Sequence, residues 1–109
     1  MKKILCVDNQ KDLIDVLASN NKQAIIVDCL LIDNLGMVLL QSTINYYNKN
    51  NHIILLSVNN SLPYLIFAIE NDFKFIITKL KNTNIDNYKE LAKKHKCRIF
   101  NFTENIFKC

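Results

Sequence analysis

Apolar residues follow two patterns that alternate along this chain. Five short, mostly apolar runs rich in β-branched residues predict the strands of a buried sheet, at Lys3–Val7, Ala24–Val27, His52–Ser57, Phe73–Thr78 and Cys97–Phe102. The stretches between these runs have apolar residues at helical spacing, three or four positions apart. The pattern therefore predicts a strict alternation of strand and helix, with a strand at each end.

Helix-capping residues suggest where the intervening helices begin. Four helices are expected, over Gln10–Ser19, from Asp33 or Asn34 through Tyr47, over Leu62–Glu70, and over Ile85–His95 with Asn84 as its cap. Ser61 precedes the third helix and Pro63 lies in its first turn, where a missing N–H removes no hydrogen bond. The segment LPYLIFAIE is apolar almost all round, which is typical of a helix that is deeply buried or that associates with another surface.

Alternating strands and helices predict an α/β fold with a doubly wound parallel sheet of five strands in one domain, 1–109. Crossover connections are right-handed in about 98% of cases, so three successive connections in one direction place three helices on one face. We expect the fourth helix to return across the other face and to bring the last strand beside the first. The predicted strand order is 5-1-2-3-4. One helix would cover its face thinly, which suggests completion by a second subunit.

Polar residues lie where four of the predicted strands end: Asp8 and Asn9, Asp28, Ser57 and Asn59, and Thr78 and Lys79. The carboxyl ends of parallel strands share one edge of a sheet, where ligands bind in open α/β folds. Carboxylate oxygens suit Mg²⁺, and a hydroxyl and an ammonium group can stabilise a transferred phosphoryl group. A purely structural alternative is that the carboxylates cap helices, Ser57 ends a strand and Lys79 pairs with a carboxylate. Spacing alone leaves these two interpretations about even.

Several segments resemble the receiver domain of two-component response regulators. KKILCVDNQKDL is similar to the first strand and helix start of a receiver, and IIVDCLLIDNLGMVLL to its phosphoacceptor strand and loop. HIILLSV resembles the following strand, and AIENDFKFIITKL the segment that ends in the conserved lysine. The resemblance extends from Ile25 to Leu80 and over the first dozen residues, with consistent spacing.

The resemblance implies a flavodoxin-like fold and specific roles for the polar set. It places Asp28 at the phosphoacceptor position, Ser57 at the conserved Ser/Thr and Lys79 at the conserved lysine. It implies Mg²⁺ held by Asp8, Asn9, Asp28 and the backbone carbonyl near Leu30. The expected partner is a histidine kinase or another signalling protein.

The chain departs from the receiver pattern in ways that weaken phosphorylation. The interval from Asp8 to Asp28 is too short for one strand–helix unit that receivers have, and the last strand, Cys97–Phe102, is an addition. Asn9 replaces an acidic residue, and Leu80 replaces a proline that follows the lysine across a cis bond. We expect a trans bond before Leu80, because a non-proline cis bond costs about 2.5–4 kcal/mol. Ile76 replaces the aromatic switch residue that receivers have three positions before the lysine. Ile32 replaces the proline that receivers have in the loop after the phosphoacceptor.

Three functions are compatible with these observations. The first is a degenerate, single-domain receiver-like protein that acts by binding a partner, with aspartyl phosphorylation weakened or absent. The second is an Mg²⁺-dependent phosphoacceptor with Asp28 as its site. The third is an anti-sigma-factor antagonist of the STAS type, because IDNLGMVLL is similar to a motif of that family with Asn34 at the phosphorylated position. The N-terminal strand pair of that family is not apparent, and Lys79 would have no role.

Association is expected to involve the apolar third helix. Its candidate interface residues are Leu62, Tyr64, Leu65, Ile66, Phe67 and Ile69. Burial within the monomer is the alternative for this helix, and it is about equally supported by the pattern. A homodimer is therefore one expected state of the protein.

Composition narrows the remaining classes. No window approaches the roughly 20 apolar residues of a membrane span. The apolar run before Asp8 is too short for a secretory signal peptide, so we expect a cytoplasmic protein. The four cysteines have no metal-type spacing and are expected to be reduced, although Cys109 could form an artefactual disulfide. The net charge of +4 and the cluster of Lys89, Lys93, Lys94, Lys96 and Arg98 indicate a solvated helix end, not a nucleic-acid site. A single glycine disfavours an enzyme with a phosphate-cradling loop.

Overall fold

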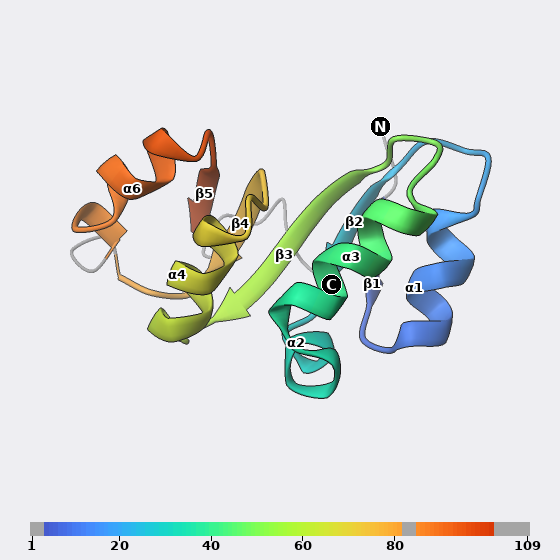
Figure 1. Cartoon of the computed structure of the whole chain (residues 1–109), viewed down its shortest axis with the longest axis horizontal. Helices are drawn as coiled ribbons and strands as arrows, with labels where there is room; N and C mark the ends of the chain where they lie inside the picture. Colours follow the sequence, from blue (N-terminus) through green and yellow to red (C-terminus); the bar gives the residue numbers. More distant parts are fainter. Residues whose placement is uncertain (1–3, 82–84, 102–109) are drawn as a thin grey trace.

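The computed structural model describes residues 4–81 and 85–101. Within them, five strands form one sheet: β1 (Ile4–Val7), β2 (Ala24–Val27), β3 (Ile53–Asn59), β4 (Phe75–Thr78) and β5 (Arg98–Asn101). Every neighbouring pair in this sheet is parallel. The predicted α/β fold with a five-stranded parallel sheet is therefore confirmed (Figure 1).

In the same described residues, the strands are connected by the helices α1 (Gln10–Leu17), α2 (Leu30–Leu35), α3 (Met37–Tyr47), α4 (Leu62–Glu70) and α6 (Lys89–Lys94). Two of them begin at side-chain caps. The Asn9 side chain accepts a hydrogen bond from the Asp12 N–H, and the Ser61 hydroxyl accepts one from the Tyr64 N–H. The predicted cap of the last helix, Asn84, lies outside the described residues.

The second predicted helix begins earlier than Asp33 or Asn34. It starts at Leu30, directly after the β2 strand, because the Asp28 side chain accepts the Leu30 N–H at 2.9 Å. Gly36 then divides the helical region into α2 and α3, with φ 80° and ψ 158°. That backbone conformation is essentially restricted to glycine, so the helix cannot continue through it.

The predicted strand order 5-1-2-3-4 is wrong. The observed order is β1-β2-β3-β4-β5, with β5 paired to β4 in the register Ile76 to Ile99. The chain therefore keeps adding strands on the same side and does not return to β1. The prediction failed because it assumed that a helix must cover the second face of the sheet.

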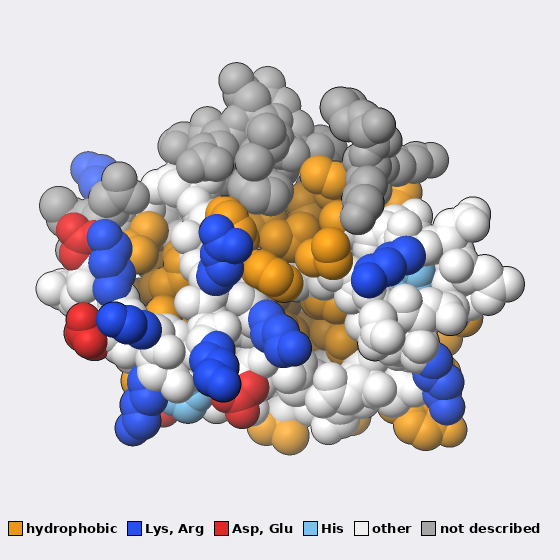
Figure 2. All heavy atoms as spheres, turned by 90° about the horizontal axis from the view of Figure 1, so that it is seen from above, with side chains coloured by type: hydrophobic (Ala, Val, Ile, Leu, Met, Phe, Trp, Pro, Cys, Tyr) orange, Lys and Arg blue, Asp and Glu red, His pale blue; other side chains and the backbone are white. Residues whose placement is uncertain are grey.

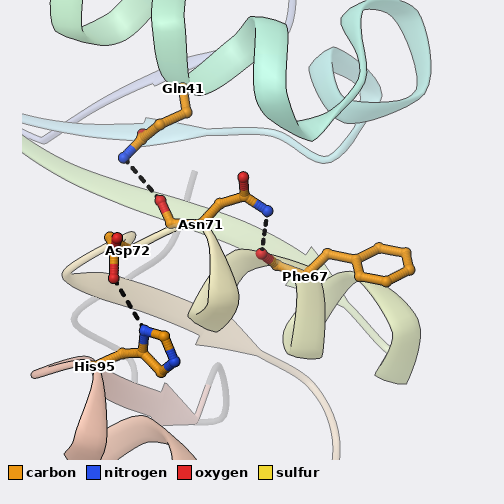
Figure 3. A network of polar contacts seen from close by, with 5 residues as sticks. All are labelled: Gln41, Phe67, Asn71, Asp72 and His95. Carbon is orange, nitrogen blue, oxygen red and sulfur yellow. Dashed lines mark hydrogen bonds and ion pairs between the residues drawn. The ribbon is translucent and has the colours of Figure 1, made fainter.

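Local contacts hold β5 beside β4. The Arg98 N–H donates to the Lys74 carbonyl at 2.8 Å, and the Phe75 and Phe100 rings stack with centroids 6.3 Å apart. His95, which follows α6, contacts Asp72 in the turn before β4 at 3.0 Å (Figure 3). These contacts fix the end of α6 at the start of β4, so the next strand forms along the nearest edge.

The described helices all pack on one face of the sheet (Figure 1). One core cluster joins strand residues such as Val27, Leu56 and Ile76 to residues from each of the five helices, including Leu13 and Leu65. Successive right-handed crossovers in one direction place their helices on a common face, which accounts for this arrangement. The doubly wound arrangement that was predicted is not present in the part of the chain that the structure describes.

The second face of the sheet presents a separate apolar cluster made of strand residues. Ile26, Leu55 and Ile77 are its buried members, and Ile4, Ala24, Phe75 and Phe100 pack against them. These residues alternate along the strands with those of the helix-covered face, as the period of two in a β-strand requires. The short apolar runs of the sequence therefore do face apolar surroundings on both sides.

Two sequence expectations outside the sheet can be compared with the structure. Cys6 is disulfide-bonded, so the prediction of reduced cysteines is wrong for this residue, whereas Cys29 and Cys97 are free. Cys109 lies outside the described residues. No helix in residues 4–81 and 85–101 is long and apolar enough to cross a membrane.

The predicted basic cluster lies on and after α6. Lys93 and Lys94 occupy the last turn of α6, where cations interact favourably with the helix dipole, and Lys89 pairs with Asp86 at 2.8 Å. Figure 2 views the edge at which the strands begin and shows more Lys and Arg side chains on the side of α6 and β5 than on the side of α1. Apolar side chains are visible in the centre of the same edge.

Candidate functional site

Four of the predicted polar side chains line one cavity at the edge where the strands end. This cavity has a volume of about 410 Å³, and its lining includes Asp8, Asp28, Ser57 and Lys79. They follow or end β1, β2, β3 and β4, which are neighbours in the sheet. The parallel register explains the convergence, because Val7 pairs with Val27 and Val27 with Leu56 at the same level of the sheet.

Asp28 is held in place by the backbone of the elements on either side of it. Its N–H donates to the Val7 carbonyl at 2.9 Å, and its Oδ2 accepts the Leu30 N–H at 2.9 Å. Its carbonyl also accepts the Leu31 N–H at 3.0 Å. The carboxylate therefore starts α2 while it lines the cavity, so the capping and chemical interpretations of this residue are compatible.

Asn9 is engaged in a different structure. Its Oδ1 accepts the Asp12 N–H at 2.9 Å, and its Nδ2 donates to Asp8 at 3.0 Å and to Asp12 at 2.8 Å. The amide oxygen that was expected to bind a metal is thus the N-cap of α1. Asn9 is also not among the residues that line the cavity.

Leu30 lines the cavity as the first residue of α2. Backbone carbonyls in a helix point toward its C-terminus. The Leu30 carbonyl therefore points along α2, away from the Asp28 carboxylate that its own N–H contacts.

Asn59 also lines the cavity. In the sequence it is one of the polar residues at the predicted strand ends, and no function was predicted for it. Its carbonyl accepts the Lys79 N–H at 2.8 Å and the Thr78 hydroxyl at 2.9 Å. Its φ of 52° lies in the left-handed region, and the β3–β4 register shifts between Ser57 and Asn59. This irregularity extends β3 beyond the predicted end at Ser57 and sets the position of the Lys79 backbone.

A second group of polar contacts extends from the site along α2. The Asn59 Nδ2 donates to the Cys29 Sγ at 3.0 Å, and the Tyr64 hydroxyl donates to Asp33. Burial, followed by the nearby charges of Asp28 and Asp33, raises the pKa of the Cys29 thiol. The hydrogen bond to Asp33 raises the pKa of the Tyr64 phenol. Pairwise spacing does not reveal this connection, because Asp33 and Tyr64 are 31 residues apart.

The donor set fits only a limited magnesium site. In the described residues, no group of three or more His, Cys, Asp and Glu side chains is placed to hold a metal ion. The cavity supplies two carboxylates, from Asp8 and Asp28. Mg²⁺ is commonly bound through one or two carboxylates, with water and phosphate oxygens completing its octahedron. These two residues would hold such an ion, without Asn9 or the Leu30 carbonyl.

The candidate interface helix α4 is largely a core element. Leu65 and Ile69 are fully buried, and Leu62, Tyr64 and Ile66 are partly exposed. Phe67 is 50% exposed, and it alone among the six predicted interface residues is in the exposed class. Association through α4 would therefore depend on Phe67 and the edges of its neighbours.

A second hollow, of about 460 Å³, lies at the opposite edge, where β3 and β4 begin. Its polar lining includes His52 and Asn48, which are hydrogen-bonded to one another through the Asn48 side chain and the His52 backbone. These hydrogen bonds stabilise the fold, whereas Asp8, Asp28 and Lys79 line the cavity at the other edge.

Comparisons with protein-family models, with curated proteins and with solved structures gave no match for this chain.

Proposed function

We propose that this chain is a degenerate receiver-like signalling protein that acts by binding another protein, with phosphoryl transfer to Asp28 weakened or lost. The observation that supports this proposal is the meeting of Asp8, Asp28, Ser57 and Lys79 around one cavity. Two carboxylates, a hydroxyl and an ammonium group at the carboxyl edge of a parallel sheet are suited to phosphoryl chemistry.

Three features support weakened chemistry. Asn9 caps α1, so its amide oxygen is already engaged. Leu30 follows the Asp28–Cys29 turn and is the first residue of α2. Its helical conformation directs its carbonyl away from the Asp28 carboxylate. The described peptide bonds include no cis bond, so Lys79 is followed by a trans bond to Leu80, as expected. Each feature departs from the receiver pattern that the sequence resembles.

The alternative is a working phosphoacceptor that depends on Mg²⁺. In that case Asp8 and Asp28 would hold the ion, which would lower the charge repulsion between the carboxylate and an incoming phosphoryl donor. Ser57 and Lys79 would then contact the transferred oxygens. The common cavity favours this second function as a candidate, because all four side chains line the same space.

The third candidate has less support. Asn34, the position that would be phosphorylated in a STAS-type antagonist, is exposed on α2 and does not line the cavity.

Incubation with acetyl phosphate and Mg²⁺, followed by intact-mass measurement, separates the first two functions. We expect little or no adduct from the native sequence at a donor concentration that saturates a typical acceptor. Asp15→Asn is a matched control, because Asp15 is an exposed carboxylate on α1 and does not line the cavity. Stoichiometric addition of one phosphoryl group that Asp28→Asn abolishes and Asp15→Asn preserves would contradict weakened chemistry and establish the alternative.

A further inference from the structure

Helix α2 is attached at its N-terminal end to the candidate site. The Asp28 carboxylate accepts its first N–H, from Leu30, at 2.9 Å. The preceding residue, Cys29, accepts a hydrogen bond from Asn59, whose carbonyl in turn accepts the Lys79 N–H. The position of α2 therefore depends on groups that line the cavity.

The exposed side of the same helix is attached to α4. Asp33 lies one helical turn after Leu30, and its carboxylate accepts the Tyr64 hydroxyl. Tyr64 is in the first turn of α4, where its own N–H is held by the Ser61 hydroxyl at 3.2 Å. Through this side-chain pair, the exposed side of α2 contacts the helix that presents Phe67 to solvent.

The C-terminal end of α2 is joined to α3 by a residue that permits a change of direction. Gly36 has a backbone conformation outside the helical region, and a Cβ at this position would meet no atom within 4 Å. Glycine can change φ and ψ at low cost. The six-residue helix α2 thus lies between a glycine joint, whose N–H and carbonyl bond to Ile32 and Leu40, and two side-chain anchors.

We propose that α2 transmits the state of the Asp28 carboxylate to the surface of α4. A group that takes over the carboxylate oxygen removes the acceptor of the Leu30 N–H, α2 turns about Gly36, and the Asp33–Tyr64 hydrogen bond breaks. By reciprocity, loss of the Asp33–Tyr64 bond loosens the Leu30–Asp28 bond by the same free energy. This inference rests on the proposed function only for the identity of the group that occupies Asp28.

The coupling is tested without any phosphoryl donor. The Tyr64 ring is followed in ¹³C-tyrosine-labelled protein by NMR during a pH titration, with its signal assigned from Tyr64→Phe. The native phenol is expected to titrate above the ordinary tyrosine value of about 10. Asp33→Asn removes the acceptor charge and is expected to lower the pKa of Tyr64. Asp28→Ala is expected to lower it as well, although residue 28 does not contact Tyr64.

Asp28→Asn provides the matched control. Its amide oxygen can still accept the Leu30 N–H, so the Tyr64 titration is expected to stay close to that of the native protein. A Tyr64 titration in Asp28→Ala that matches the native curve would overturn the coupling. So would equal shifts in Asp28→Asn and Asp28→Ala, because a through-space charge effect would then account for both.

A reciprocal measurement keeps the inference testable if Asp28→Ala is unstable. Tyr64→Phe keeps the ring and removes the hydroxyl, and we expect about fivefold faster hydrogen exchange at the Leu30 amide, in line with the loss of one hydrogen bond. Tyr46→Phe, a change at an exposed tyrosine on α3, is expected to leave that amide unaffected. Unchanged exchange in Tyr64→Phe would overturn the coupling, whatever the outcome of the acetyl phosphate experiment.

Discussion

His52 joins separate segments of the chain through one buried imidazole ring. Its Nδ1 accepts the Gln23 N–H at 3.2 Å, and its Nε2 lies 2.9 Å from the Ser19 carbonyl. Since Nδ1 accepts, the ring proton lies on Nε2 and is donated to Ser19. In the sequence, His52 is only a histidine at the start of an apolar run. Its partners could not be predicted, because they come together only when the α1–β2 and α3–β3 connections meet at one edge of the sheet.

We expect His52→Ala to lower the free energy of unfolding by about 2–4 kcal/mol. The change leaves the Gln23 N–H without its acceptor and creates a cavity at a side chain that is 4% exposed. Urea denaturation measures the effect. His95→Ala is the matched control, because its ion pair with the exposed Asp72 is worth only about 0–1 kcal/mol. Equal losses in the two variants would contradict the structural role assigned to His52.

Cys97 makes stability depend on alkaline pH. Burial raises the pKa of its thiol to about 11, compared with 9.0 for an unperturbed cysteine. As the pH rises, the unfolded chain therefore loses this proton before the folded protein does. The contribution of the protonated Cys97 thiol to the free energy of unfolding is complete below pH 9 and disappears as the pH rises toward 11. We expect the free energy of unfolding to fall by about 2 kcal/mol at most over this interval.

Comparison with Cys97→Ala separates the effect of the Cys97 thiol on the free energy of unfolding from the effects of other groups that titrate at high pH. The variant is expected to show a shallower decline between pH 9 and 11 in urea denaturation. Cys29→Ala serves as a second comparison, because that thiol is partly exposed. Parallel pH profiles for the native protein and Cys97→Ala would count against this account.

At the scale of the elements, sequence pattern predicted the strands better than the boundaries between helices. Ala24–Val27 was placed without error, because its apolar run ends at a carboxylate. The start of β4 was placed at Phe73, two residues early, because Phe73 is a buried turn residue that follows Asp72 in a left-handed conformation. The α2–α3 boundary was missed because the conformation of Gly36 depends on how both helices pack.

We expect Gly36→Ala to lower the free energy of unfolding by about 1–3 kcal/mol. The space around the new methyl group is open, so the loss comes from the backbone conformation alone. Asn34→Ala, an exposed change in the same helix, is expected to stay within about 0.5 kcal/mol of the native value. Thermal or urea denaturation of the two variants measures the difference, and a neutral Gly36→Ala would mean that the joint can adopt an ordinary helical backbone.

At the scale of the whole molecule, the edge where the polar residues meet could be predicted, and the winding of the chain could not. Parallel strands of similar length bring Asp8, Asp28 and Ser57 to one edge in any strand order, so that prediction did not depend on topology. The order itself depends on where β5 pairs. That pairing involves contacts such as the Arg98 N–H with the Lys74 carbonyl, which have no signature in the spacing of apolar residues.

Association is the remaining expectation at this scale. We expect light scattering to show a dimer that Phe67→Glu converts to a monomer, because Phe67 is a large apolar side chain of α4 that is half exposed. Tyr46→Glu, at an exposed aromatic residue on α3, is the control that should leave the dimer intact. A native protein of monomer mass would remove α4 as a self-association surface, and then a different protein would be the expected partner of Phe67.

The strand order has an evolutionary consequence. Because each strand of β1-β2-β3-β4-β5 pairs with its neighbours in sequence, no connection has to pass over another part of the sheet. A gene duplication or deletion that adds or removes one strand–helix unit at the β5 edge would leave the remaining pairings unchanged. Such a lineage could therefore change its length in steps of one unit, as solenoid repeats do, while the edge that gathers the acidic residues is preserved.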